Sequence, residues 1–119
     1  MNYHSRIFQV VTNSDNGDTS SETTFHYKQE GNILTSIYSG GSIVSGHLLG
    51  IVDDDGNIDM QYHHINSNGE IMTGLCKSTP EILKDGRIRL HEEWKWTNGD
   101  QSSGKSTLEE ILFDANSIS

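Results

Sequence analysis

The chain has 119 residues and a formal net charge of −9, and it contains one cysteine and one proline. Its length suits a single domain over residues 1–119, and its acidity, with no cluster of Lys or Arg, disfavours binding to nucleic acid or to an anionic membrane. The lone Cys76 excludes an internal disulfide, no apolar stretch is long enough to span a membrane, and Gln9 and Thr12 interrupt any signal-peptide core, so we expect a cytoplasmic protein.

The residue types favour β-structure. The chain has one alanine against 12 isoleucines, nine threonines and four valines. Alanine is the strongest helix former, whereas β-branched side chains fit a pleated sheet. We therefore expect an all-β protein.

Seven glycine-bearing turns divide the chain, with 10 to 17 residues between successive turn glycines. They are Asn16-Gly17, Glu30-Gly31-Asn32, Gly40-Gly41, Asp55-Gly56, Asn68-Gly69, Asp85-Gly86 and Asn98-Gly99. Asn-Gly and Asp-Gly favour tight hairpins, because a type I′ turn needs a positive φ at both central residues. Seven successive hairpins predict about eight antiparallel strands, each paired with its neighbour along the chain.

The expected strands lie between these turns, near residues 5–12, 22–28, 32–39, 42–52, 57–65, 70–79, 87–96 and 101–113. Alternation is clear in two early strands. One face carries Thr23, Phe25 and Tyr27 in the first of these, and Ile58, Met60, Tyr62 and His64 in the second.

Residues 42–52 are apolar on both faces. Strict alternation groups Ile43, Leu49 and Ile51 on one face, and Val44, Leu48 and Val52 on the other together with Gly46 and Gly50. Glycine inside a strand marks a bulge, a bend or a close approach of another group.

Two segments favour short helices as alternatives to strands. Pro80 followed by residues 81–84 predicts a single helical turn with proline at its first position. Leu108, Ile111 and Leu112 have helical spacing within residues 108–115, but we favour a strand there.

Eight short strands joined by local hairpins form either a closed up-and-down barrel or a strongly curled sheet. We favour a closed or nearly closed barrel of the lipocalin-like or calycin-like kind, because closure removes exposed strand edges. A barrel of about eight strands has an interior that is filled by side chains or holds one small ligand.

The clearest strand, residues 87–96, carries an acid on its apolar face. Glu92 shares that face with Leu90, Trp94 and Trp96. A buried carboxylate needs a partner or a raised pKa. Glu92 either anchors a cationic or hydroxyl-bearing ligand between the indoles, or is satisfied by Tyr62, His64 or an arginine, or lies at a solvated mouth.

The candidate ligand-binding residues are those that this face and its neighbours would bring together. They are Glu92, Trp94, Trp96, Tyr62 and His64. The alternative is that these aromatic side chains only fill a core.

The spacing of the remaining polar residues gives little support to a metal site, a calcium loop or a cysteine nucleophile. A metal site formed by His47, His64 and Glu92 has suitable ligand types but no supporting sequence motif, so we expect no metal and no cofactor. The run Asp53–Asn57 does not fit the EF-hand pattern and predicts a solvated turn. Cys76 has no neighbouring His and is expected to be a small buried residue.

Several phrases carry a family resemblance. They are Tyr38-Ser39-Gly40-Gly41, Gly46-His47-Leu48, Gly74-Leu75-Cys76 and Leu90–Trp96. Over nearly the whole chain the sequence resembles a small family of uncharacterised bacterial proteins, some of which are labelled N-acetylglutamate synthase. Such acetyltransferases grip coenzyme A with a Gly- and Arg/Gln-rich turn on a larger α/β fold, which this chain lacks, so no catalytic residue carries over. The expected barrel is also similar to lipocalin-like and avidin-like barrels by architecture.

Three functions fit these observations. The leading hypothesis is a barrel that binds a small, partly apolar ligand in its interior. The second is an enzyme that uses an inward carboxylate and histidine, Glu92 with His64 or His47, for acid–base chemistry. The third is a non-catalytic structural or interaction protein with a filled core and an exposed apolar patch. Oligomeric state, ligand identity and pathway are not encoded legibly.

Overall fold

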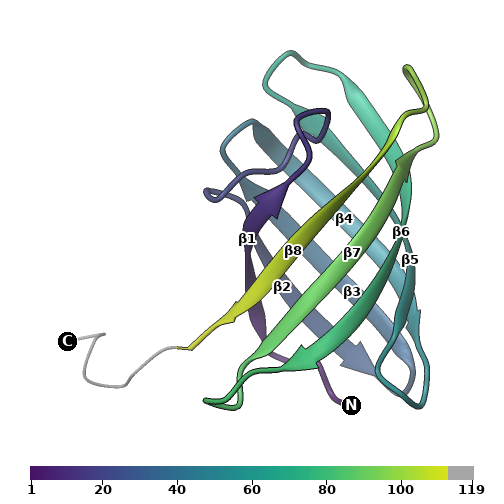
Figure 1. The fold of residues 1–119 in the computed structure, drawn as a ribbon. Helices are drawn as coiled ribbons and strands as arrows, with labels where there is room; N and C mark the ends of the chain where they lie inside the picture. Colours follow the sequence, from purple (N-terminus) through teal and green to yellow (C-terminus); the bar gives the residue numbers. More distant parts are fainter. Residues whose placement is uncertain (113–119) are drawn as a thin grey trace.

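A computed structural model describes residues 1–112, and these residues form eight strands and no helix. The strands are β1 (Ile7–Asn13), β2 (Thr24–Glu30), β3 (Ile33–Gly40), β4 (Ile43–Val52), β5 (Ile58–Asn66), β6 (Ile71–Ile82), β7 (Ile88–Trp96) and β8 (Ser103–Ile111). Each strand pairs antiparallel with its sequence neighbours, and β8 pairs with β1, so the sheet closes into a barrel (Figure 1). The predicted all-β, up-and-down barrel is confirmed.

Inward and outward side chains alternate along the strands as predicted. On β7, the inward residues are Ile88, Leu90, Glu92, Trp94 and Trp96, none more than 9% exposed. The predicted inward faces of β2 and β5 are confirmed in the same way. The period of two therefore identifies the barrel interior from the sequence.

The tight hairpins differ in type from the prediction. At the β4–β5 turn, Gly56 has a φ of 85°, but Asp55 does not share the positive φ that a type I′ turn requires. The Gly56 amide donates to the Asp53 carbonyl at 3.0 Å. This is a type I turn followed by a glycine in the left-handed region, which also closes a hairpin. The same hydrogen-bond pattern occurs at Asn66–Gly69 and Leu83–Gly86.

The first predicted turn forms, with the Gly17 amide donating to the Ser14 carbonyl at 3.0 Å, but it does not make a tight hairpin. Gly17 lacks a positive φ and lies inside a long loop, residues 14–23, that joins β1 to β2. Its neighbours Asn13 and Thr19 are joined by side-chain hydrogen bonds instead of by a ladder. This β1–β2 loop lies at the upper end of the barrel in Figure 1.

The predicted faces of β4 are wrong at its first residues. Ile43 is buried and Val44 is exposed, whereas Leu49 and Ile51, grouped with Ile43 by strict alternation, are exposed. The register with β5 shifts between Ile43 and Ser45. A bulge adds one residue to one strand and so exchanges its inward and outward faces.

The predicted helical turn after Pro80 is also wrong, because Pro80 lies within β6 opposite Leu90. The pairing of β5 with β6 ends at Ile58 and Ser78, so Pro80 lies where β6 has a neighbour on one side only. A missing N–H is tolerated at such an edge position. The helical alternative near the C-terminus is wrong for Leu108–Ile111, which belong to β8; residues 113–115 lie outside the described residues.

The lower end of the barrel in Figure 1 is closed by the N-terminal segment. Tyr3 is fully buried there, packs against Phe8 and Tyr27, and donates its hydroxyl hydrogen bond to the Gly56 carbonyl. Further fully buried side chains fill this half, namely Leu34, Ile58, Ile88, Leu90 and Leu108. The lower half is therefore a packed core.

Candidate functional site

The upper half of the barrel contains a cavity of about 50 Å³. Residues of the β1–β2 loop line it on one side, and inward side chains of the strands line the rest. Glu92, Trp94 and Trp96 reach it from β7, and Tyr62 and His64 from β5. All five residues predicted from the sequence thus lie around one cavity.

Glu92 lies at the hydroxyl-lined side of the cavity. The Ser78 hydroxyl, from β6, donates to one carboxylate oxygen at 2.5 Å, and the Ser106 hydroxyl, from β8, lies 3.3 Å from the other. These partners are not the Tyr62, His64 or arginine expected from the sequence. Burial raises the pKa of the Glu92 carboxyl, although hydrogen bonds from Ser78 and Ser106 act in the opposite direction.

The two indoles form the aromatic wall next to Glu92. The ring centroids of Trp94 and Trp96 lie 5.5 Å apart, and the Tyr62 ring meets Trp96 edge to face at 5.7 Å. The Trp94 N–H donates to the Asn13 side chain at 3.1 Å, and the Trp96 N–H donates to the Asn16 carbonyl at 3.0 Å. Because Asn13 at the end of β1 and Asn16 in the loop accept the two N–H groups, the ring surfaces rather than the indole donors remain for the cavity.

His64 connects the cavity wall to the loop above it. Its Nδ1 lies 2.8 Å from the Tyr38 hydroxyl, and its Nε2 lies 2.9 Å from Asp18 Oδ2. Burial raises the pKa of Tyr38, so its hydroxyl stays protonated and can donate to Nδ1. We accordingly assign the remaining ring proton to Nε2, which donates to the Asp18 carboxylate.

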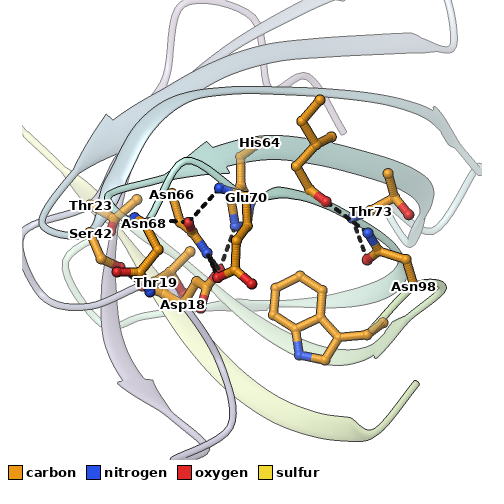
Figure 2. Close-up of polar contacts among 12 residues, drawn as sticks. Asp18, Thr19, Thr23, Ser42, His64, Asn66, Asn68, Glu70, Thr73 and Asn98 are labelled. Atoms are coloured by element: carbon orange, nitrogen blue, oxygen red, sulfur yellow. Dashed lines mark hydrogen bonds and ion pairs between the residues drawn. The ribbon is translucent and has the colours of Figure 1, made fainter. Parts of the chain in front are cut away.

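The β1–β2 loop is held over the cavity by polar contacts with neighbouring turns (Figure 2). The Asn66 side chain donates to Asp18 at 3.3 Å, and the Ser42 hydroxyl donates to the Asp18 carbonyl at 2.7 Å. Asn66 also donates to Glu70 at 3.1 Å, which ties the β5–β6 turn to the same cluster. Asp18 therefore anchors the loop to β5 and to the β3–β4 turn.

Three aromatic rings of the cavity lie against glycines on the adjacent strand. The directly opposed pairs are Tyr38 with Gly46, Tyr62 with Gly74, and Trp94 with Gly104. A Cβ atom added at any of these glycines would come within 2.2 to 2.5 Å of the ring opposite it. The absence of a side chain makes the room for each ring, as the close-approach reading of Gly46 predicts.

Residues 1–111 match the family described as avidin-like protein. The chain belongs to the avidin-like family. No curated protein and no solved structure matches it significantly. The resemblance to avidin-like barrels inferred from the strand pattern is thereby confirmed.

The hypothetical metal site does not assemble in this avidin-like barrel. His64 and Glu92 face inward, but His47 is exposed and stacks on His63 on the outer surface, with ring centroids 5.7 Å apart. Residues 1–112 contain no cluster of three or more His, Cys, Asp or Glu side chains suited to a metal ion.

This described part of the chain has no helix that could cross a membrane.

Cys76 and the acidic turn of the avidin-like barrel lie where the sequence predicts. Cys76 is buried on β6, and burial raises the pKa of its thiol, which makes it a poor nucleophile. Asp53 accepts hydrogen bonds from the amides of Asp55 and Asn57 at 2.9 Å, as in a solvated turn.

Sequence reasoning missed several cavity residues outside β5 and β7, although Phe25 of β2, which lies on a predicted inward face, does line the cavity. Asp18 lies in a loop, where no periodicity marks an inward side chain. Tyr38 could have been found, because it follows Leu34 and Ser36 in an alternating series on β3, and all three are buried. The same argument applies to Ser106 on β8, which is buried and alternates with the buried Leu108.

Proposed function

We propose that this avidin-like barrel binds a small, partly apolar ligand in its upper cavity. Glu92, Trp94, Trp96, Tyr62 and His64 are the proposed contacts. The observation that carries the proposal is the meeting of one buried carboxyl group with several aromatic rings around an unfilled space inside a closed barrel. Membership of the avidin-like family favours small-ligand binding in general.

The surroundings of the cavity support a site formed in advance of binding. The indole N–H groups and the His64 ring are fixed by hydrogen bonds to Asn13, Asn16 and Asp18. Side chains fixed before binding lose little conformational entropy on binding, which favours affinity.

The size of the cavity limits the ligand. Drug-sized ligands occupy pockets of roughly 300–1,000 Å³. A cavity of about 50 Å³ corresponds to only a few water-sized groups. The proposed ligand is therefore compact, or it inserts a compact group while the rest of the molecule lies toward the β1–β2 loop.

The enzyme alternative is less well supported. It places Glu92 and His64 within hydrogen-bond reach of each other or of one substrate position. Glu92 bonds to Ser78 and Ser106, whereas His64 bonds to Tyr38 and Asp18. The two groups share a cavity but no hydrogen-bond partner, so direct acid–base cooperation has no geometric basis here.

The structural-protein alternative expected a filled interior and an exposed apolar patch. The upper half of the barrel is not filled. Exposed apolar side chains do lie around a shallow groove on the outer wall, namely Ile33, Leu49, Ile51 and Leu75. This groove is separate from the five proposed contacts.

Native mass spectrometry of the purified protein tests the proposal. We expect a small molecule to be retained, and its removal to change the tryptophan fluorescence, because both tryptophans of the chain line the cavity. The matched variants are His64→Ala and His63→Ala, which alter adjacent residues on opposite faces of β5. His64→Ala should weaken retention by about tenfold or more, and His63→Ala should leave it unchanged. A bare mass with no fluorescence response to added small molecules would contradict the proposal.

A further inference from the structure

Glu92 is an acid without a basic partner. Its hydrogen bonds come from serine hydroxyls on β6 and β8. Among the described residues lining the cavity there is no Lys or Arg, and the one basic side chain, His64, is paired with Asp18. Within residues 1–112 the Arg side chains and Lys105 form ion pairs elsewhere, namely Arg6 with Glu110, Arg87 with Asp85 and Glu109, Arg89 with Glu81 and Glu109, and Lys105 with Glu93.

The aromatic wall beside Glu92 is suited to a positive charge. The face of an aromatic ring carries negative potential, and tryptophan attracts cations most strongly. Trp94, Trp96 and Tyr62 all line the cavity, at centroid separations of 5.5 and 5.7 Å for the two contacting pairs. A group placed between them and Glu92 would meet π-faces together with a carboxyl group.

The cavity is correspondingly poor in donors for an anion. Both indole N–H groups already donate to Asn13 and Asn16, and the hydroxyls of Ser78 and Ser106 donate to Glu92. The net charge of −9 and the Asp18 side chain of the β1–β2 loop produce an electrostatic field that attracts cations and repels anions.

We propose that the ligand presents a compact protonated amine or methylated ammonium group, whose charge pairs with Glu92 and whose alkyl surface contacts Trp94, Trp96 and Tyr62. This inference rests on the proposed function and assigns a chemical class to its ligand. The position of Glu92 inside the barrel is then explained, because a buried carboxyl group without a basic partner contributes to recognition rather than to the core.

Binding should depend on pH through Glu92. The titratable groups around it are Tyr27 of β2, Tyr38 of β3, Tyr62 of β5 and Cys76 of β6, all with pKa values raised by burial, so they remain neutral near pH 7. Asp18 and His64 are hydrogen-bonded to each other at the loop. An ammonium group favours the ionised form of Glu92, so affinity should fall as the pH decreases and the carboxyl group becomes protonated.

Three probes of similar size and different charge test this inference: propylammonium, 1-propanol and propionate. Tryptophan fluorescence titration measures their affinities for the intact protein, and native mass spectrometry counts the bound molecules. We expect propylammonium to bind at least about tenfold more tightly than 1-propanol, and propionate more weakly than both. Glu92→Gln should remove most of the preference for propylammonium over 1-propanol, together with its pH dependence.

The control is Glu93→Gln, which makes the same charge change at an exposed neighbour on the outer face of β7. It should leave all three affinities unchanged. Equal or tighter binding of 1-propanol or propionate would overturn the cation inference while supporting a small-ligand site. A preference for propylammonium that persists in Glu92→Gln would overturn it too. If none of the probes binds and native mass spectrometry of the purified protein detects no bound small molecule, the proposed function itself is wrong.

Discussion

At the scale of single residues, Glu92 departs most from what packing alone would select. It lies between apolar neighbours on β7, is 9% exposed, and has hydroxyl partners that leave its charge unbalanced. In general, residues that serve a function can lower the stability of the fold. Three glycines contribute to the site by lacking a side chain. A Cβ atom at Gly46, Gly74 or Gly104 would clash with the aromatic ring opposite it.

Glu92→Gln should stabilise the protein at neutral and alkaline pH. The folded-state pKa of Glu92 is raised, so between its unfolded value and that raised value the native state binds more protons than the unfolded state. The free energy of unfolding of the native sequence should therefore fall as pH rises through this range, and glutamine removes this loss. We expect a gain of about 1–3 kcal/mol at pH 8 that vanishes near pH 4.

Denaturant unfolding of both proteins from pH 4 to pH 8 measures this difference. Glu93→Gln, which alters an exposed side chain, should show no such pH-dependent gain. Parallel stability curves for the native sequence and Glu92→Gln would show that Glu92 is not held in a destabilised state.

At the scale of elements, the β1–β2 loop is the part of the barrel that a strand count does not describe. Asp18 fixes it through His64 and Asn66, and its carbonyl accepts from Ser42. The loop lines the cavity and accepts a hydrogen bond from the Trp96 indole at Asn16, so it helps to position the aromatic wall. Its order should consequently govern how fast a ligand leaves.

Asp18→Ala should loosen this loop without unfolding the barrel. The change removes two side-chain contacts and leaves the buried His64 Nε2 without its acceptor, at a cost of about 1–2 kcal/mol in the free energy of unfolding. Amide hydrogen exchange at Gly17 and Thr23, whose N–H groups bond within the loop, should accelerate by about tenfold. The control is Asp15→Ala, an exposed acid of the same loop. Equal exchange rates in the two variants would refute the anchoring role of Asp18.

At the scale of the whole molecule, the barrel divides into a packed lower half and an upper half that holds the cavity. The N-terminal segment closes the lower end through Tyr3, which contacts Phe8, Tyr27 and Gly56. Pairing of β1 with β8 closes the sheet, so the strands have no free edge along the barrel wall. The packed core and the proposed binding cavity thus lie at opposite ends of the barrel.

Tyr3→Ala should therefore reduce stability strongly and leave ligand binding intact. Loss of a fully buried aromatic ring costs about 3–5 kcal/mol in the free energy of unfolding. Tyr3→Phe keeps the ring and loses only the hydrogen bond to the Gly56 carbonyl, for about 1 kcal/mol. Denaturant unfolding compares the stability of the two variants with that of the native chain. Tryptophan fluorescence titration measures whether the cavity still binds ligand. A loss below about 1 kcal/mol in Tyr3→Ala would mean that the N-terminal segment does not close the barrel.

The sequence by itself determined the local features of this protein. A period of two along β2, β5 and β7 identified the inward faces, and glycine turns gave the number of strands, because both signals depend only on neighbouring residues. These signals were sufficient to select Glu92, Trp94, Trp96, Tyr62 and His64. They failed where a single residue changes the phase, as at the bulge after Ile43, or where an edge position removes a constraint, as at Pro80.

Only the tertiary structure decided whether those inward residues meet and what accompanies them. Closure of β8 on β1 and the path of the loop through Asp18 are long-range events, since the Asp18–His64 contact joins residues 46 positions apart. Which half of the barrel is filled depends on where Tyr3 and the loop lie, because the same alternating strands surround a core at one end and a cavity at the other. A pattern of neighbours determines which way a side chain points, but only packing determines what it meets.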